Sequence, residues 1–275
     1  MLIEADALQH RLVSGERFAL LDTRERYEWQ QGTLPHAQHI NVYDYFIDEC
    51  TDEGIHAMAD DVAIGWQRLA IDENVTPVFF EQQVGMRSPR GAWFAWLIGR
   101  EDSLILNGGV EAWLAAGGGL SPGHGLSSSV EHQTLRGVQP TNQRRWVASR
   151  QQMQQANHRT SIILDARRPT EFDGSFVHDC CHRAGRIPEA RLLFWEEVLD
   201  NGKFRSPEDI AARARAIGLH PEQQIMIYCH RGARAATVLA ALKLAGYRHL
   251  SIYVGSWHEW AEHHELPLVQ GVQDI

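Results

Sequence analysis

The sequence is poor in cysteine and has no long apolar run. Four cysteines among 275 residues are too few for a disulfide framework, so each thiol needs its own explanation. No apolar run approaches the roughly 18 residues that a membrane helix needs, and the N-terminus lacks the basic segment and apolar stretch of a secretory signal. These absences predict a cytoplasmic protein with no membrane partner.

Positive charge is also scarce. The chain has 26 lysines and arginines against 35 acids and a net charge of −9, which argues against a nucleic-acid partner because phosphate backbones attract basic surfaces. Hydrophobic residues make up 44% of the chain, which is enough for an ordinary buried core. The length exceeds that of a usual single domain, so we expect two domains of roughly 130 residues each.

Four short segments occur twice along the chain, in the same order. The pairs are Leu21–Arg24 with Leu164–Arg167, Gly32–Ala37 with Gly185–Ala190, Pro77–Phe80 with Ile225–Tyr228, and Gly108–Trp113 with Gly255–Trp260. Chance is a poor explanation for four ordered matches. The sequence therefore indicates an internal duplication.

Each half alternates short apolar strands with helical patterns, which predicts an α/β fold with a mainly parallel sheet flanked by helices. In the second half, Ser206 as an N-cap and Pro207 at the first helical position predict a helix that is stopped by Gly218. A Gly-rich and then Ser- and Gln-rich stretch between the halves predicts an extended linker. We place the N-terminal domain at 1–120, the linker at 121–145 and the C-terminal domain at 146–275.

One loop of the C-terminal half is suited to chemistry. An apolar strand ends at Tyr228, and an Ala- and Leu-rich helix is predicted from about Arg234 to Ala245. Cys229 therefore lies at a strand-to-helix turn, where α/β proteins bind ligands. The backbone N–H groups that follow it have no helical partners and can point at its sulfur.

The charges around Cys229 favour a thiolate over a thiol. Arg231 and Arg234 add to the positive end of the helix dipole, and Gly232 lets the backbone bend tightly. The alternative is a buried core cysteine, because cysteine packs as a small hydrophobe. Two arginines so close to a core cysteine would be costly, however, and they suit an anionic ligand better.

With these motifs the chain resembles the tandem-domain rhodaneses, a family that includes thiosulfate and 3-mercaptopyruvate sulfurtransferases. The resemblance rests on Leu-Asp-x-Arg, Gly-x-Ile-Pro-x-Ala and Gly-Ser-Trp-x-Glu-Trp, and it covers nearly the whole chain. It implies two rhodanese-like domains, with the catalytic Cys229 opening a six-residue loop that ends at Arg234. Glu81 stands at the matching position of the N-terminal domain, which implies that this domain is catalytically inactive.

The resemblance also implies a two-step sulfur transfer without a metal or organic cofactor. Cys229 would take sulfur from a small donor as a persulfide and pass it to cyanide, a small thiol or a protein thiol. The loop residues expected to bind the substrate are His230, Arg231, Gly232, Ala233 and Arg234. A basic residue two positions after the cysteine favours thiosulfate as the donor. The loop nevertheless departs from the Gly-Val-Thr ending common in the family, and 3-mercaptopyruvate is the alternative.

Four residues outside the loop are further candidates for substrate binding. In the family, the segment before the Gly-x-Ile-Pro element contributes arginine to the active site, which points to Arg183 and Arg186. Asp48 resembles an aspartate that faces the cleft from the N-terminal domain. Trp257 is expected to pack in the core or to line the pocket.

Cys180 and Cys181 lie just before the Gly-x-Ile-Pro element and have three open interpretations. They are a redox or sulfur-relay partner for Cys229, or incidental thiols of a loop, or zinc ligands together with His178 and His182. Ligands spaced so closely would leave a zinc site cramped, so we predict no metal.

Two other functions match parts of the pattern. A cysteine-dependent phosphatase or arsenate reductase also places cysteine at such a turn, but its arginine generally follows six positions later, whereas Arg234 lies five positions after Cys229. A non-catalytic rhodanese-like binding module usually lacks the cysteine. Both observations favour the sulfurtransferase.

Overall fold

The computed structural model describes residues 1–124, 144–157 and 160–271. These residues divide into two compact units. The first comprises the described residues of Met1–Phe46, Met58–Gln143 and Asn201–Phe204, and the second those of Ile47–Ala57, Arg144–Asp200 and Arg205–Ile275. Most of the predicted linker, 121–145, lies outside the described residues.

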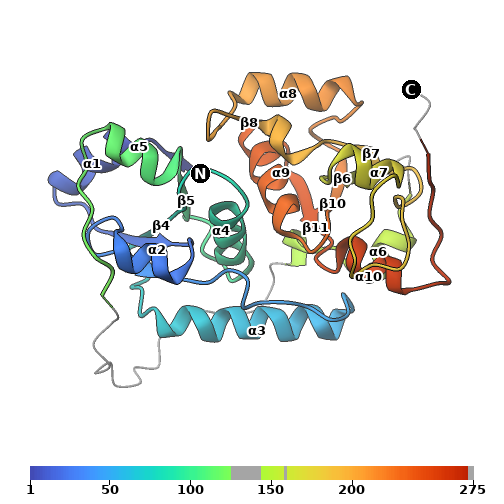
Figure 1. Ribbon diagram of the computed structural model, residues 1–275, viewed down its shortest axis with the longest axis horizontal. Coiled ribbons are helices and arrows are strands. Elements are labelled where there is room, and N and C mark those ends of the chain that lie inside the picture. The colour runs from blue at the N-terminus through green and yellow to red at the C-terminus, as the bar shows by residue number, and fades with distance from the viewer. Residues whose placement is uncertain (125–143, 158–159, 272–275) are drawn as a thin grey trace. The chain divides into compact units, whose positions relative to one another are not determined.

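The first unit is built on a parallel sheet of five strands in the order β1-β5-β4-β2-β3 (Figure 1). The strands are β1 (Leu2–Ile3), β2 (Phe18–Asp22), β3 (Gln38–His39), β4 (Thr76–Phe80) and β5 (Leu104–Leu106). β2 and β4 pair along their whole length, from Phe18 opposite Thr76 to Asp22 opposite Phe80. Their carboxyl ends therefore meet at one edge of the sheet, where ligand-binding loops form in α/β folds.

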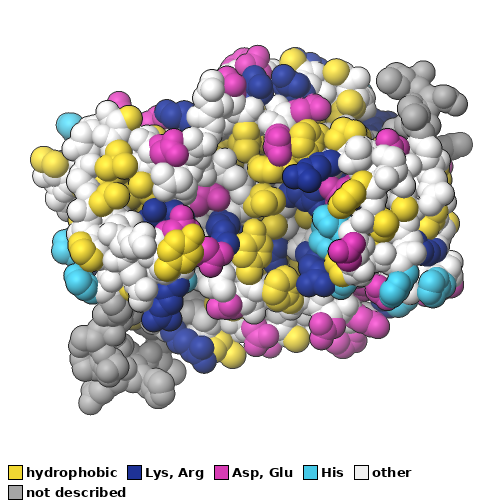
Figure 2. All heavy atoms as spheres, in the orientation of Figure 1, with side chains coloured by type: hydrophobic (Ala, Val, Ile, Leu, Met, Phe, Trp, Pro, Cys, Tyr) yellow, Lys and Arg dark blue, Asp and Glu magenta, His cyan; other side chains and the backbone are white. Residues whose placement is uncertain are grey.

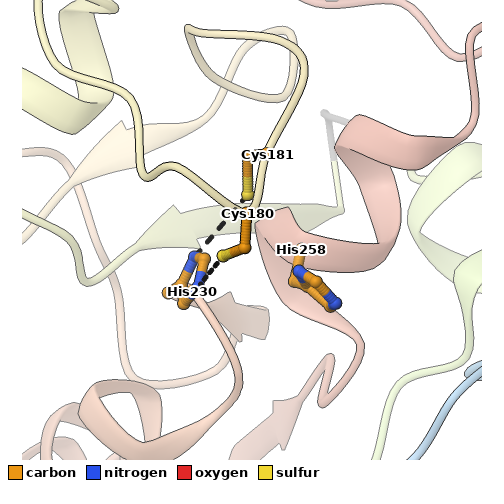
Figure 3. Close-up of side chains that lie close together, drawn as sticks. All are labelled: Cys180, Cys181, His230 and His258. Carbon is orange, nitrogen blue, oxygen red and sulfur yellow. Dashed lines mark hydrogen bonds between the residues drawn. The ribbon is translucent and has the colours of Figure 1, made fainter.

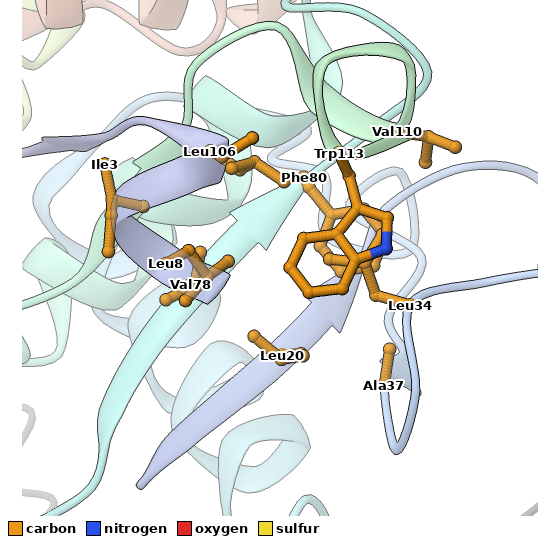
Figure 4. Packing of buried hydrophobic residues seen from close by; sticks show 11 residues of the cluster. Ile3, Leu8, Leu20, Leu34, Ala37, Val78, Phe80, Leu106, Val110 and Trp113 are labelled. Atoms are coloured by element: carbon orange, nitrogen blue, oxygen red, sulfur yellow. The ribbon is translucent and has the colours of Figure 1, made fainter. Parts of the chain in front are cut away.

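Helices cover both faces of this sheet. They are α1 (Ala5–Val13), α2 (Arg26–Gln31), α4 (Arg87–Leu97), α5 (Gly109–Ala115) and the part of α3 (Asp52–Arg68) from Met58 onwards. On one face, Phe80 of β4 belongs to a buried cluster with Leu8 of α1 and Trp113 of α5 (Figure 4). Because side chains alternate along a strand, Phe79 points to the other face, where its ring lies 6.3 Å from that of Trp66 in α3.

The second unit contains a parallel sheet of four strands in the order β11-β10-β6-β7. The strands are β6 (Ser161–Asp165), β7 (Arg191–Leu192), β10 (Gln224–Tyr228) and β11 (His249–Ile252). The short strand β8 (Leu199–Asp200) lies outside this sheet, and β9 (Lys203–Phe204) falls among the residues of the first unit. The helices are α6 (Arg150–Gln154), α7 (Pro169–Asp173), α8 (Pro207–Ala216), α9 (Ala233–Leu244) and α10 (Ser256–Glu262), with 3₁₀ turns at Arg144–Trp146 and Trp195–Val198. The predicted α/β fold with parallel sheets flanked by helices is confirmed. No helix in the described ranges is long and apolar enough to cross a membrane.

The helix predicted after Ser206 is α8. Ser206 Oγ accepts the N–H of Asp209 at 3.1 Å, and Pro207 is the first helical residue. Such a cap typically stabilises a helix by about 1 kcal/mol. The chain then leaves α8 through Gly218, whose φ of 76° lies in the left-handed region that favours glycine.

The repeated Leu-Asp-x-Arg segment forms the same buried ion pair in both units. In each, the arginine Nη2 lies 2.6 Å from the aspartate Oδ2 and also donates to the carbonyl of the glycine that opens the second repeated segment, at 2.7 or 2.8 Å. The residues are Asp22, Arg24 and Gly32 in the first unit and Asp165, Arg167 and Gly185 in the second. Because a buried charge must keep its partners, these residue types recur together.

Candidate active site

Cys229 follows β10, which is an inner strand of the second sheet, and precedes α9. The cysteine is 1% exposed, and its backbone is held on both sides. Its N–H donates to Ser256 Oγ at 3.2 Å, and its carbonyl accepts the N–H of Trp257 at 3.0 Å. The Gly232 N–H donates to Cys229 Sγ at 3.1 Å. The sulfur thus has a backbone donor that stabilises negative charge on it.

Gly232 makes this contact possible because it adopts a left-handed conformation, with φ 86° and ψ −16°. It is the N-cap of α9, so the chain turns from the strand into the helix at this residue. A side chain at this φ would be strained. The positive end of the α9 dipole lies beside Ala233, the first helical residue of the loop.

His230 lies directly after the cysteine and is packed among other imidazoles. Its carbonyl accepts the N–H of His258 at 3.1 Å, and its ring centroid lies 4.2 Å from that of His178. Burial, followed by the charges of His178, Arg234 and His258, lowers the pKa of His230 to about 3. The ring is therefore neutral at neutral pH and does not add a positive charge for an anionic donor.

Arg231 is the exposed arginine of the loop. Its Nη2 lies 2.8 Å from His258 Nε2. Burial lowers the pKa of His258, and the charge of Arg231 lowers it further, so the imidazole is a neutral acceptor for the guanidinium. Histidine side chains lie beside lysine or arginine and acidic side chains on the face of this unit that Figure 2 shows.

Arg234 is held by a carboxylate. Its Nη2 donates to Glu171 Oε1 at 2.9 Å, and its Nη1 donates to the other carboxylate oxygen. The side chains are 12% and 2% exposed. Burial alone would raise the pKa of Glu171, but the hydrogen bond and the charge of Arg234 outweigh it and lower the pKa to about 2. Arg234 therefore ties the loop to α7 rather than standing ready for a donor.

Arg183 and Arg186 bind backbone carbonyls. The Arg183 guanidinium donates to carbonyls at and beyond the end of α10, among them those of Ala261 at 3.2 Å and Leu266 at 2.9 Å. Arg186 is buried and donates to the carbonyl of Gly271 at 2.6 Å. The carbonyls at the C-terminus of a helix such as α10 attract cations, because the last four have no partner within the helix. We therefore do not assign either arginine to substrate binding.

Asp48 and Trp257 have different surroundings. Asp48 is exposed, on a segment fixed two residues later by Cys50, whose N–H donates to Glu259 Oε1 at 2.8 Å. Burial raises the pKa of the Cys50 thiol to about 12, so that cysteine is inert. Trp257 is buried beneath the loop, with the Arg167 guanidinium 4.6 Å from its ring centroid, which fits the core role rather than a pocket wall.

The adjacent cysteines face His230 (Figure 3). Cys180 is exposed, with its Sγ 3.5 Å from His230 Nε2. Cys181 is buried, with its Sγ 4.0 Å from Nδ1, and burial followed by the neighbouring Cys180 raises its pKa to about 12. His178, one of the histidines weighed as a zinc ligand, instead has its Nε2 3.0 Å from Glu171 Oε1.

Three residues at this site were missed in the sequence, namely Glu171, Ser256 and His258. Ser256 and His258 lie within the repeated Gly-Ser-Trp-x-Glu-Trp element, which follows β11 at the same sheet edge as Cys229. The position of this repeated element in the sequence could therefore have indicated that Ser256 and His258 lie near Cys229. No pattern near Glu171 indicates that it pairs with an arginine far along the chain.

Comparisons with known proteins agree with this architecture. A rhodanese-like domain model matches residues 4–116 and 147–263. A thiosulfate sulfurtransferase of Azotobacter vinelandii is 26% identical over 274 residues, which cover 98% of this chain and 96% of the relative. A probable 3-mercaptopyruvate sulfurtransferase of Pseudomonas aeruginosa is 30% identical over 223 residues, covering 79% of this chain and 76% of the relative. The solved structure of an anaerobic ergothioneine biosynthesis enzyme from Chlorobium limicola shares the fold, with a TM-score of 0.78 and 20% identity over 99% of this chain and 70% of its own.

Proposed function

Because the chain belongs to the rhodanese family of sulfurtransferases, we propose that it moves a sulfane sulfur from thiosulfate to cyanide or a thiol through a persulfide on Cys229. The observation that carries this proposal is the contact of the Gly232 N–H with Cys229 Sγ, 3.1 Å long, at the carboxyl end of an inner strand. A backbone donor aimed at a cysteine sulfur suits a group that is an anion both before and after it takes up sulfur.

In the first step, the Cys229 thiolate attacks the outer sulfur of thiosulfate. A sulfur–sulfur bond forms to Cys229, the donor's own sulfur–sulfur bond breaks, and the electron pair leaves with sulfite. In the second step, cyanide or a thiolate attacks the outer sulfur of the persulfide, and Cys229 departs as a thiolate. Charge and electrons balance in both steps, so neither needs an oxidant or a metal.

Arg231 is the residue we assign to the thiosulfate dianion. It is exposed, and its Nη2 lies 2.8 Å from Nε2 of the neutral His258. When the Arg231 guanidinium turns from the His258 imidazole to the thiosulfate dianion, a charged acceptor replaces a neutral one, which strengthens the hydrogen bond. Arg234 is a positioning residue, because Glu171 holds it in the loop.

The second candidate donor is 3-mercaptopyruvate. A relative named as a probable 3-mercaptopyruvate sulfurtransferase shares 30% identity with the chain. The single carboxylate of 3-mercaptopyruvate lies several bonds from the transferred sulfur, so this donor depends less on a cation beside Cys229. The phosphatase alternative is weaker, because Arg234, the arginine that an oxyanion would need, already forms an ion pair with Glu171. The binding-module alternative is weaker because Cys229 is retained.

The proposal is tested by thiocyanate formation from cyanide with each donor in turn. The wild-type protein is expected to turn over thiosulfate with higher kcat/KM than 3-mercaptopyruvate. Cys229→Ser is expected to abolish turnover with both donors and to keep the circular dichroism spectrum, because a hydroxyl forms no persulfide. Cys50→Ser is the matched control, since it removes another buried thiol. Thiosulfate turnover near the wild-type level in Cys229→Ser would refute the assignment.

A further inference from the structure

Two cysteines and two histidines cluster at the Cys229 loop, and none of them bonds to the transferred sulfur in the steps described above. Cys180 and Cys181 lie in the loop before Gly185, His230 follows Cys229, and His258 lies in α10 (Figure 3). One donor atom from each lies within 4.8 Å of the donor atoms of all the others. We propose that these four residues bind a thiophilic divalent cation such as Zn²⁺, and that the bound ion slows sulfur loading of Cys229.

The spacing of the donors is close to that of a filled site. With Zn–S near 2.3 Å and Zn–N near 2.0–2.1 Å, tetrahedral ligands lie about 3.3–3.8 Å apart. Cys181 Sγ lies 4.0 Å from His230 Nδ1, slightly outside that range. The remaining separations, up to 4.8 Å, require a contraction of about 1 Å, which side-chain rotation can provide.

One rotation in particular is required. Cys180 Sγ faces Nε2 of His230, whereas Cys181 Sγ faces Nδ1, and one imidazole binds a given ion through only one nitrogen. Cys180 is exposed and has room to move, whereas Cys181 is buried. We therefore expect Cys180 to complete the site by shifting towards a position shared with Cys181.

The chemistry of the donors selects the ion. Two sulfurs and two imidazole nitrogens form a Cys₂His₂ set, which suits Zn²⁺ and other thiophilic metals. Mg²⁺ and Ca²⁺ prefer oxygen ligands, and the four residues offer none. Two thiolates also balance the charge of a divalent ion. These ligands replace the pair His178 and His182, because His178 already contacts Glu171.

The ion would act on the loop through two of its ligands. His230 is the residue after Cys229, so a bond to its imidazole restrains the backbone that must accommodate the donor. His258 is the contact of Arg231 at 2.8 Å, so metal binding at this imidazole competes with the guanidinium and places a second positive charge beside it. This consequence for sulfur loading depends on the proposed function, whereas the binding itself does not.

Binding is tested with Co²⁺ on the reduced full-length chain after removal of metals by a chelator. Four thiolate and imidazole ligands are expected to give the intense visible absorption of tetrahedral Co²⁺ and a thiolate-to-cobalt band in the near ultraviolet. Titration should end at one ion per chain, and Zn²⁺ should abolish both bands. A wild-type protein without these bands would overturn the proposal.

Four variants identify the ligands. The double variant Cys180→Ser/Cys181→Ser is expected to lose the bands, and His258→Gln to weaken binding by at least about the 10- to 100-fold typical of outer-sphere changes. His182→Gln is the matched control, because it removes a histidine of the same loop outside the cluster, and it should bind like wild type. Cys229→Ser should also retain the bands. Bands that persist in the double variant, or vanish with Cys229→Ser, would contradict the assigned ligands.

The effect on sulfur loading is measured by intact mass at short times after addition of thiosulfate, with no cyanide present to compete for metal. Zn²⁺ should slow the mass gain of the wild type and leave the rate for the double cysteine variant unchanged. Equal slowing in both proteins would contradict regulation through this site. If thiosulfate adds no sulfur even without Zn²⁺, the proposed function fails while the Co²⁺ spectra still decide whether the metal site exists.

Discussion

The two halves of the chain fill the same strand-to-helix turn with different groups. In the N-terminal half, Glu81 Oε1 accepts backbone N–H groups from Gly85, Arg87 and Ser88 at 2.8–3.0 Å. In the C-terminal half, the sulfur of Cys229 accepts an N–H at 3.1 Å. In both turns a backbone N–H donates to the side chain that opens the loop, and in the first that side chain is the protein's own carboxyl group. The comparison suggests that the N-terminal loop is closed to a donor by its own side chain.

A second comparison separates the loop arginines. At the start of each loop helix, an arginine pairs with an acid near the helix that follows the Leu-Asp-x-Arg segment: Arg87 with Glu25, the N-cap of α2, and Arg234 with Glu171 of α7. This arginine is thus part of the scaffold in both halves. Arg231 has no such counterpart, because Gln83 stands at the matching position. The residues that distinguish the C-terminal loop are therefore Cys229, His230 and Arg231.

The largest effect on stability is expected at the more buried of these two ion pairs, Arg234 with Glu171. Glu171→Gln leaves the Arg234 charge, 12% exposed, without a counter-charge, and should lower the free energy of unfolding by about 3–5 kcal/mol. Glu25→Gln removes the equivalent charge in the other half, where the glutamate is 54% exposed, and should change it by less than about 1 kcal/mol. Chemical denaturation of both variants checks this difference. Similar losses would contradict the distinction between the two pairs.

The same pair predicts a dependence of stability on acid. The folded-state pKa of Glu171, about 2, lies below its ordinary value of 4.5. Its contribution is therefore fully present above the ordinary pKa and is lost as the pH falls towards 2. The difference in melting temperature between wild type and Glu171→Gln should shrink over that interval. A constant difference from pH 5 to about pH 2 would show that Glu171 does not stabilise the fold through its charge.

Catalysis should respond to Arg231 and not to its counterpart. Arg231→Ala removes a charge-assisted hydrogen bond to thiosulfate and should lower kcat/KM by about 10- to 100-fold, corresponding to roughly 1.5–3 kcal/mol. Gln83→Ala should leave it unchanged. The loss with 3-mercaptopyruvate should be smaller than with thiosulfate. Equal losses for both donors would mean that Arg231 activates Cys229 instead of binding the donor, and a loss confined to 3-mercaptopyruvate would reverse the preferred donor.

The smallest effect on turnover is expected at Glu81. Glu81→Ala leaves buried N–H groups without their acceptor and should destabilise the N-terminal half by about 1–3 kcal/mol. Sulfur transfer should stay close to wild type, because the N-terminal loop has no thiol. A large fall in kcat without unfolding would show that the first domain takes part in the reaction.

The sequence predicted the parts of the site that depend on local structure. The apolar strand before Cys229, the glycine at the turn and the helix after it are all read from neighbouring residues, and the structure has them at β10, Gly232 and α9. The partners of Arg183 and Arg234 could not be predicted in this way. Their acceptors lie some 60 to 80 positions away in the chain, and only tertiary packing shows that these donors are occupied.

The central claim, a persulfide on Cys229, is tested most directly by mass spectrometry of peptides. After thiosulfate treatment and alkylation, the wild-type protein should carry one additional sulfur on the peptide with Cys229, and cyanide should remove it. Cys229→Ser should gain none, and the peptide with Cys180 and Cys181 should stay unchanged in both proteins. Sulfur found on Cys180 or Cys181 instead of Cys229, or gained by Cys229→Ser, would contradict the account.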